Sequence, residues 1–184
     1  AWLWPLRETR RKAGRTFATA LANLNAYPDY IYGASQPQQF EWVKQDYPGL
    51  YKKIKEAVKE GRFEVQGGMW VEADTNISGG EALVRQFLYG KKFWKEEFGK
   101  EIDTLWLPDV FGFSGALPQI MRGCGCENFL TIKLSWNMVN DFPFHSFRWR
   151  GIDGSEVLVH MPPEGNYNSP ANPRVLKYAS ANYS

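Results

Sequence analysis

The sequence predicts an α/β fold in which the strands form a parallel sheet or a β/α barrel. Short apolar runs of strand character alternate with longer segments whose apolar residues recur at helical spacing. Chains in which strands and helices alternate usually bury a parallel sheet beneath the helices. The 184 residues show no internal repeat, and a chain of this length is expected to form one domain with a sizeable core.

The first half of the chain is predicted to hold helices separated by short strands. Phe17, Leu21 and Leu24 form an apolar stripe on the first helix, and basic residues lie on its other face. Pro37 begins the next helix, since proline is tolerated in the first turn. The expected elements are a helix over residues 7–25, a strand over 30–32, a helix from 37 through 43, a helix after 48–49 that stops at Gly61, and a strand over 62–66.

The second half continues the alternation. Leu83, Phe87 and Trp94 recur at helical spacing in the longest predicted helix. The sequence GIDG at 151–154 is typical of a turn and joins the last two strands as a hairpin. The expected elements are a helix over residues 80–98, a strand over 104–107, a helix over 117–122, a strand over 129–132, and two strands over 146–150 and 157–160.

Composition and charge exclude some classes of partner. The net charge is +2, and lysines and arginines alternate with acidic residues, which is typical of solvated helix faces. No apolar run approaches the ~18 residues of a membrane span, and no signal peptide is recognisable. We therefore expect neither a nucleic acid nor a membrane as partner. The eight tryptophans offer flat faces that suit packing and carbohydrate stacking equally well.

The cysteines and histidines argue against a metal site of their own. Cys124 and Cys126 are the only cysteines, and two ligands this close would need partners. Cysteines separated by one residue also rarely reach disulfide geometry. Free thiols are typical of a reducing compartment, so we expect a cytoplasmic protein. His145 and His160 are interpreted as hydrogen-bonded structural groups rather than ligands.

One acidic residue follows a predicted buried strand. The segment WLPDVFG at 106–112 ends its strand at Pro108 and places the carboxylate of Asp109 in a loop. The carboxyl ends of buried strands are where α/β enzymes keep catalytic groups. Asp109 could instead cap the following helix, since aspartate is favoured at caps. Phe111 and Phe113 favour the catalytic interpretation, because loop aromatics beside an acid suit the stacking of a sugar ring.

A second loop carboxylate, Asp74, is expected at the same face of the sheet. A glycosidase needs two carboxyl groups that flank the scissile bond, one to attack or activate water and one to protonate the leaving oxygen. Trp2, Trp70 and Phe111 would supply flat apolar walls for a pyranose ring. The alternative is that Asp74 caps the turn at 75–76 and that Trp70 belongs to the core.

Several ordered motifs together resemble those of one enzyme family. They are AWLWPLRET at 1–9, GGMWVEAD at 67–74, GEALVRQF at 80–87, WLPDVFG at 106–112, SWN at 135–137 and FRWRGIDGS at 147–155. The chain is similar to the catalytic N-terminal domain of the class II α-mannosidases, glycoside hydrolase family 38, in particular to the bacterial and cytosolic branch. The resemblance covers residues 1–184 as a partial catalytic domain, which starts just after the expected His-x-Asp zinc motif.

The resemblance implies a retaining glycosidase on a seven-stranded parallel β/α barrel, incomplete in this chain, with a catalytic Zn²⁺. Asp109 matches the family's nucleophile, which also binds the metal. Trp2 matches the aromatic residue that stacks on mannose, and Phe111 matches a second aromatic wall. Asp74 matches an acid that lines the site, and Lys133 stands where the family often has a basic group near the nucleophile.

Two family features are missing from these residues. The other zinc ligands, the His-x-Asp pair and a further histidine, are expected outside residues 1–184, which leaves Asp109 as the one matching ligand. The general acid is not identified, because Asn168 stands where some relatives have an aspartate, and an amide cannot donate a proton as a carboxylic acid does. Glu164 lies nearby, although a loop glutamate is usually just solvated.

The resulting hypothesis is hydrolysis of terminal, non-reducing α-linked mannose from oligosaccharides. Two alternatives remain open. A metal-dependent carbohydrate deacetylase would need a histidine-rich metal site, and a non-catalytic carbohydrate-binding module would need only the aromatic walls. An unpaired sheet edge would also favour association into a homo-oligomer.

Overall fold

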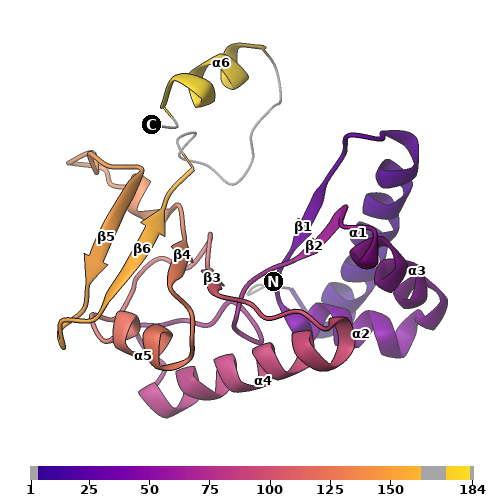
Figure 1. The fold of residues 1–184 in the computed structure, drawn as a ribbon, viewed down its shortest axis with the longest axis horizontal. Helices are drawn as coiled ribbons and strands as arrows, with labels where there is room; N and C mark the ends of the chain where they lie inside the picture. Colours follow the sequence, from indigo (N-terminus) through magenta and orange to yellow (C-terminus); the bar gives the residue numbers. More distant parts are fainter. Residues whose placement is uncertain (1–3, 163–172, 183–184) are drawn as a thin grey trace.

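The computed structural model describes residues 4–162 and 173–182 of the chain (Figure 1). Its helices are α1 (Leu6–Ala26), α2 (Pro37–Asp46), α3 (Pro48–Lys59), α4 (Gly80–Phe98), α5 (Leu117–Gly123) and α6 (Pro173–Asn182), with a short 3-10 helix η1 (Lys133–Ser135). Its strands are β1 (Tyr32–Ala34), β2 (Phe63–Val65), β3 (Thr104–Trp106), β4 (Asn128–Leu130), β5 (Ser146–Arg150) and β6 (Glu156–His160). Helices and strands therefore alternate through most of the chain, as the sequence predicts.

The strands form two sheets that are joined by a backbone hydrogen bond. β1 and β2 pair in parallel, and the second sheet has the order β3-β4-β6-β5. β3, β4 and β6 are parallel, whereas β5 pairs with β6 as an antiparallel hairpin. The N–H of Gly68 donates to the carbonyl of Thr104 and so links the segment after β2 to the start of β3.

The larger sheet buries one face against helices. Leu105, Phe129 and Val159 are paired in register across β3, β4 and β6, and each is at most 2% exposed. They share a hydrophobic cluster with side chains from α4 and α5. Successive residues of a strand point to opposite faces, so the next position in each strand, which in β6 is His160, points away from these helices.

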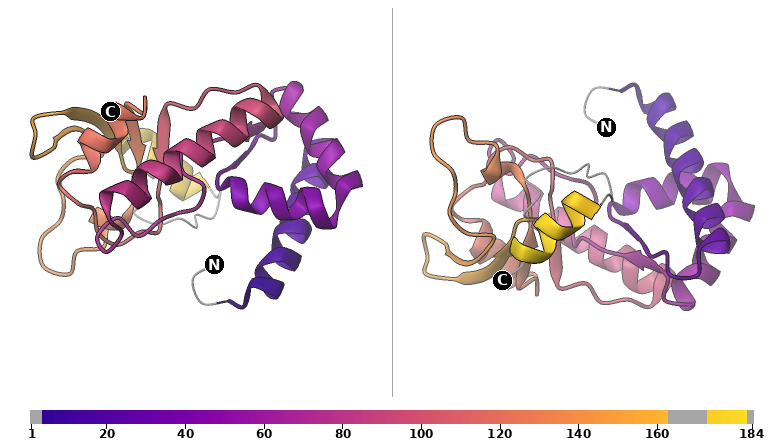
Figure 2. Two further views of the ribbon diagram at one scale, coloured as in Figure 1. Left: turned by 90° about the horizontal axis from the view of Figure 1, so that it is seen from below. Right: turned by 90° about the horizontal axis from the view of Figure 1, so that it is seen from above.

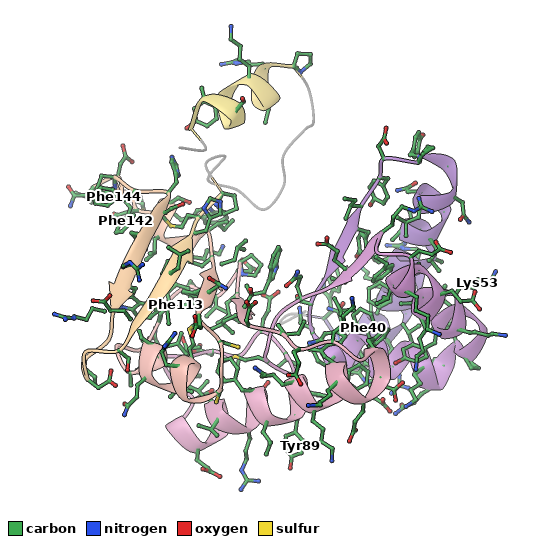
Figure 3. The ribbon with its side chains drawn as sticks, viewed as in Figure 1. Phe40, Lys53, Tyr89, Phe113, Phe142 and Phe144 are labelled. Atoms are coloured by element: carbon green, nitrogen blue, oxygen red, sulfur yellow. The ribbon has the colours of Figure 1, made fainter. Side chains whose placement is uncertain are left out.

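Two hydrophobic clusters form the core, and α4 contributes to both. The first lies among α1, α2 and α3, where the rings of Phe17, Phe40 and Phe63 pack against one another. The C-terminal half of α4 adds Trp94 to this cluster, and its N-terminal half adds Phe87 to the second cluster. Figure 2 shows α4 running along both halves of the molecule, and Figure 3 shows Phe40 inside the helical half.

The backbone that follows β2 packs directly against α4. The indole N–H of Trp94 donates to the carbonyl of Gly67 over 2.8 Å. Gly90 lies so close to the backbone between Gly68 and Trp70 that a Cβ atom at this position would overlap with it. α4 therefore sets the position of the loop that leaves β2, and this loop carries several of the predicted site residues.

The predicted elements are largely confirmed, and the differences concern the short strands. The helix predicted over residues 80–98 is α4 with the same bounds, and the predicted hairpin is formed by β5 and β6. The strand predicted over 30–32 lies instead at Tyr32–Ala34, because pairing with β2 decides its position. The α/β class is confirmed. The described residues form six strands in two sheets, so closure into a seven-stranded barrel stays a prediction.

Within residues 4–162 and 173–182, no helix combines the length and the apolar character that crossing a bilayer requires.

Candidate functional site

Polar side chains from four loops meet at the carboxyl ends of four strands. Gln36 follows β1, Glu72 lies in the loop after β2, Asp109 follows β3, and Lys133 begins η1 after β4. The side chain of Gln36 donates a hydrogen bond to Glu72, and Lys133 forms an ion pair with Asp109. The two pairs are linked because the negative charge of Asp109 acts on Glu72 and raises its pKa. We call these four residues the strand-end cluster. The carboxyl edge of parallel strands is the usual place for an active site in α/β folds.

The carboxylate of Asp109 forms an ion pair with Lys133. Nζ of Lys133 lies 2.8 Å from Oδ1 of Asp109, and the lysine side chain is 9% exposed whereas that of Asp109 is 57% exposed. The ammonium group also lies 3.5 Å from the centre of the Trp136 ring, which is a cation–π contact. Lys133 is therefore held from two sides, and it orients a carboxylate that remains accessible to a ligand.

Glu72 is the second acidic group of the strand-end cluster. Its Oε1 atom accepts a hydrogen bond of 3.1 Å from the side-chain amide of Gln36. Burial, and after it the negative charge of Asp109, raise the pKa of Glu72 to about 7, although hydrogen bonds from Gln36 and from the backbone of Asp109 act in the opposite direction. A carboxyl group with such a raised pKa is typical of functional sites.

Sequence reasoning does not single out Glu72, although a signal was available. Glu72 lies inside the GGMWVEAD motif, between the predicted site residues Trp70 and Asp74. An acid in a loop between two predicted site residues is a candidate for the same site. No comparable signal marks Gln36, whose partner in the cluster stands 36 positions away along the chain.

Gln36 has a backbone conformation that is unusual for a residue with a side chain. Its φ of 67° lies in the left-handed region, and every other described residue with a positive φ is a glycine. It directly precedes Pro37, the first residue of α2. Strained residues of this kind persist where the surrounding structure holds them, and they are frequent at functional sites.

Asp74 caps a turn, which is the alternative that its sequence leaves open. Its Oδ1 atom accepts the backbone N–H of Asn76 at 2.8 Å. The same turn contacts the loop of Asp109, because the hydroxyl of Thr75 donates to the carbonyl of Gly112 over 2.9 Å. The structure therefore brings the Asp74 turn and the Asp109 loop together, and a direct role for Asp74 with substrate stays a prediction.

Trp70 is fixed by hydrogen bonds and by ring packing. Its indole N–H donates to Oε1 of Gln38 over 3.0 Å, and its backbone N–H donates to the carbonyl of Gln86. Its ring packs edge-on against Phe93, with 5.6 Å between the ring centroids, at the border of the first core cluster. These contacts give Trp70 a packing role, and its contact with substrate stays a prediction.

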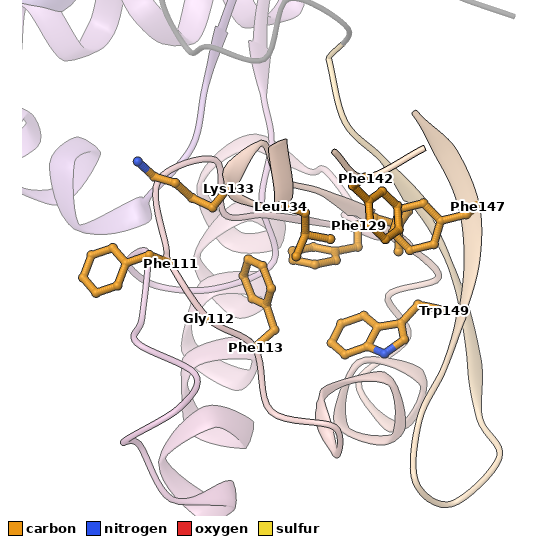
Figure 4. Close-up of a pocket in the computed structure, with 10 residues that line it drawn as sticks. Phe111, Gly112, Phe113, Phe129, Lys133, Leu134, Phe142, Phe147 and Trp149 are labelled. Carbon is orange, nitrogen blue, oxygen red and sulfur yellow. The ribbon is translucent and has the colours of Figure 1, made fainter. Parts of the chain in front are cut away.

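The two aromatic residues of the Asp109 loop have different surroundings. Phe111 is 69% exposed, whereas Phe113 packs edge-on against Phe129 with 5.0 Å between the ring centroids. A cavity of about 340 Å³ lies beside this loop, lined mainly by aromatic side chains (Figure 4). In Figure 4, Phe111 and the amino end of Lys133 point away from the gathered rings. Lys133 lines this cavity and also pairs with Asp109, so it belongs both to the cavity wall and to the strand-end cluster.

Three residues considered in the sequence analysis lie outside the described part of the chain. They are Trp2, Glu164 and Asn168. Nδ1 of His160 lies 2.9 Å from the hydroxyl of Ser146, as expected of a hydrogen-bonded structural histidine. Cys124 and Cys126 are free thiols, and burial raises the pKa of Cys126 to about 11.

The described residues do not form a zinc site by themselves. Within residues 4–162 and 173–182, no three side chains of histidine, cysteine, aspartate or glutamate gather around one point. A catalytic zinc ion normally takes three protein ligands and keeps a fourth position for water or substrate. Asp109 and Glu72 are neighbouring oxygen donors, but two carboxyl groups do not make up that set.

Comparison with known proteins decides the family. The profile described as "Glycosyl hydrolases family 38 N-terminal domain" matches residues 1–184. The chain belongs to glycoside hydrolase family 38. This family 38 chain is 56% identical over 167 residues to alpha-mannosidase 2C1 of Homo sapiens and 48% identical over 181 residues to alpha-mannosidase G of Dictyostelium discoideum. These alignments cover 91% and 98% of this chain, but only 16% and 17% of the two relatives.

The fold agrees with this assignment to family 38. The chain superimposes on a crystal structure of an alpha-mannosidase from Enterococcus faecalis V583 with a TM-score of 0.71 at 18% sequence identity. The match covers 86% of this chain and 18% of that chain. The likeness shows that the two share the α/β fold, and this chain corresponds to a limited part of the larger protein.

Proposed function

We propose that the protein to which this chain belongs hydrolyses terminal, non-reducing α-linked mannose residues of oligosaccharides. Curated relatives named alpha-mannosidase share between 46% and 56% identity with this chain, which supports the proposal. The observation that carries it is the Asp109–Lys133 pair, because it presents an oriented, accessible carboxylate at the strand ends. A glycosidase needs a carboxylate in such a place to attack the sugar.

Asp109 is proposed as the nucleophile of a retaining, two-step reaction. In the first step its carboxylate bonds to the anomeric carbon, the bond to the leaving oxygen breaks, and an acid donates a proton to that oxygen. In the second step the same residue, now a base, takes a proton from water, the water oxygen bonds to the anomeric carbon as its bond to Asp109 breaks, and mannose leaves with its original configuration. Lys133 keeps the Asp109 carboxylate in one orientation. We assign the acid to a residue outside the described part of the chain.

Aromatic and polar groups near Asp109 are proposed to bind the substrate. The exposed ring of Phe111 is available to stack on the mannose ring. Trp2, Trp70 and Asp74 are proposed as further substrate-binding residues on the resemblance to the family. Lys133 combines two roles in this proposal, since it orients the nucleophile and borders the substrate.

The cofactor and the compartment are also proposals. We propose that the complete protein binds Zn²⁺ in support of substrate binding, with Asp109 as one ligand and the other ligands outside residues 1–184. Cys124 and Cys126 are free thiols, which supports a cytoplasmic location.

The test uses the complete protein and a nitrophenyl α-mannoside. The wild-type protein is expected to release nitrophenol, and the Asp109→Asn variant to lose this activity on the order of 10³-fold or more with an unchanged unfolding temperature. Proton NMR is expected to show α-mannose as the first product, and β-mannose would contradict retention. A protein that binds mannose oligosaccharides equally well with and without Asp109, and never turns them over, would be a carbohydrate-binding module instead.

A further inference from the structure

The SWN motif at residues 135–137 belongs to a turn that begins at Lys133. The backbone N–H of Trp136 donates to the carbonyl of Lys133 over 3.1 Å and closes a 3-10 turn. On either side of Trp136, the hydroxyl of Ser135 and the side-chain oxygen of Asn137 also bond to the backbone. All three residues of the motif therefore help to fix the path of the chain next to Lys133.

The turn places the indole ring of Trp136 over the ammonium group of Lys133. Side chains three positions apart lie one above the other in a 3-10 helix, and Trp136 stands three positions after Lys133. Nζ of Lys133 lies 3.5 Å from the centre of the Trp136 ring. The contact is a cation–π interaction, for which indole is the best of the aromatic side chains.

Core packing does not explain a tryptophan at position 136. Trp136 is 50% exposed, and neither of the two core clusters of the described residues includes it. A half-exposed aromatic side chain gains less from the hydrophobic effect than a buried one. The contact of Trp136 with Lys133 does explain it, because that contact needs an aromatic face.

Lys133 needs such a contact because its charge lies at the end of a flexible stem. Holding a lysine side chain in one position costs conformational entropy, which its contacts must offset. The Lys133 side chain is 9% exposed, and its Nζ atom lies 2.8 Å from Oδ1 of Asp109. The indole face and the carboxylate therefore replace water around the ammonium group and hold it from two sides.

We infer that Trp136 is a positioning residue that holds the ammonium group of Lys133 against the carboxylate of Asp109. The inference rests on the proposed function, in which Asp109 attacks the sugar and Lys133 orients it. Without the indole face, the Lys133 side chain would occupy more positions, and the Asp109 carboxylate would be oriented less well. A displacement of about 1 Å at a catalytic group lowers a rate on the order of 10²-fold, so even a partial loss of orientation is measurable.

The first test measures steady-state kinetics of the complete protein with a nitrophenyl α-mannoside. Trp136→Leu is expected to lower kcat about three- to tenfold and to change KM less than about twofold, because Trp136 acts on the nucleophile and not on bound sugar. Trp136→Phe keeps an aromatic face, so its kcat is expected to lie between those of Trp136→Leu and wild type. In a Lys133→Met background, Trp136→Leu is expected to add no further loss, because it acts through Lys133.

The second test measures the contact between Trp136 and Lys133 without any substrate. Acetic anhydride acetylates accessible amino groups, and mass spectrometry of the resulting peptides gives a rate for each lysine. The labelling of Lys133 is expected to be slow in wild type, faster in Trp136→Leu and intermediate in Trp136→Phe. Lys92, with a side chain that is 63% exposed, serves as the internal standard in each protein.

Tyr89→Leu is the matched control, because it also replaces a half-exposed aromatic residue by leucine. Tyr89 is 51% exposed and lies on the outer side of α4 (Figure 3). This variant is expected to leave kcat, KM and the labelling of Lys133 unchanged. Thermal unfolding is expected to shift by a similarly small amount in Tyr89→Leu and Trp136→Leu, so a loss of activity in Trp136→Leu alone does not reflect unfolding.

The outcomes distinguish this inference from the proposed function. A wild-type kcat in Trp136→Leu, losses that multiply in the double variant, or a raised KM at constant kcat would overturn the positioning role. Equal labelling of Lys133 in wild type and Trp136→Leu would overturn it as well. A wild-type protein without mannosidase activity, or an Asp109→Asn variant that keeps it, would instead overturn the proposed function, and the labelling would still report on the contact between Trp136 and Lys133.

Discussion

The ammonium group of Lys133 lies 2.8 Å from the carboxylate of Asp109, and the register of two neighbouring strands explains why. β3 and β4 are parallel, with Trp106 paired to Leu130. Asp109 and Lys133 each stand three residues beyond these paired positions. When two segments follow a pair of parallel strands, residues at the same distance beyond the paired positions lie side by side at the carboxyl edge of the sheet. The ion pair therefore follows from sheet pairing rather than from any local pattern.

Replacement of Lys133 by methionine is expected to lower kcat on the order of tenfold or more. Methionine fills a similar volume but removes the charge that orients the Asp109 carboxylate. Lys133→Arg is expected to retain part of the activity, because it keeps the positive charge. The matched control is Lys44→Met, which removes the ion pair with Glu97 at 2.6 Å, away from the site. Equal activity of Lys133→Met and wild type would contradict the role of this pair.

Replacement of Gly112 by alanine is expected to disturb the contact between the Asp74 turn and the Asp109 loop. A Cβ atom at Gly112 would overlap with the side-chain amide of Asn76. Because Asn76 is exposed and its amide is the end of a flexible side chain, we expect it to change rotamer, at a cost of about 0.5–1.5 kcal/mol in the free energy of unfolding measured with urea, together with lower activity. Gly79→Ala is the control, since nothing lies within 4 Å of a Cβ atom there. If the clash is the cause, Asn76→Gly should restore part of the loss.

The thiol of Cys126 is expected to make stability depend on pH in alkaline solution. Burial raises the pKa of Cys126 to about 11 from its ordinary value of 9.0. The folded state therefore keeps its proton where the unfolded state has lost it, and this contribution is full below pH 9.0 and is lost as the pH rises through about 11. The two pKa values correspond to about 3 kcal/mol.

Urea unfolding of wild type and Cys126→Ala across this pH range measures the contribution. The difference between the two proteins isolates the thiol from tyrosines and lysines that also titrate there. In the native protein, iodoacetamide is expected to modify the half-buried Cys124 before Cys126. A parallel pH profile for the two proteins, or faster modification of Cys126, would contradict the burial of its thiol.

The 184-residue chain by itself is expected to bind Zn²⁺ weakly and to show no turnover, whereas the complete protein loses activity on chelation and regains it with Zn²⁺. The reason is the number of ligands. The described residues bring no three candidate ligand side chains together, and affinity for zinc falls steeply as ligands are removed. Isothermal titration and a nitrophenyl-mannoside assay check both parts. Tight stoichiometric binding to the isolated chain would place the ligands within residues 1–184.

The helices could be predicted from the sequence because their signals are local. In α4, Leu83, Phe87 and Trp94 recur at helical spacing, and Gly79 and Gly99 flank its ends. Gly99 has a φ of 65°, a conformation that glycine adopts without strain at the end of a helix. The short strands were less predictable. The strand expected over residues 30–32 lies at Tyr32–Ala34, because its bounds depend on pairing with β2 and not on its own side chains.

The same difference applies to the candidate site: local sequence predicts some of its residues, and contacts between distant segments decide the others. The sequence by itself predicted Asp109 and Lys133 as residues of the site, and its motifs determined the match to the family 38 model. Only the tertiary structure decided that Gln36 holds Glu72 from 36 positions away, and that burial beside Asp109 raises the pKa of Glu72 to about 7. Residue type and spacing are properties of one segment, whereas a hydrogen bond between loops and the desolvation of a carboxyl group exist only once separate strands have packed.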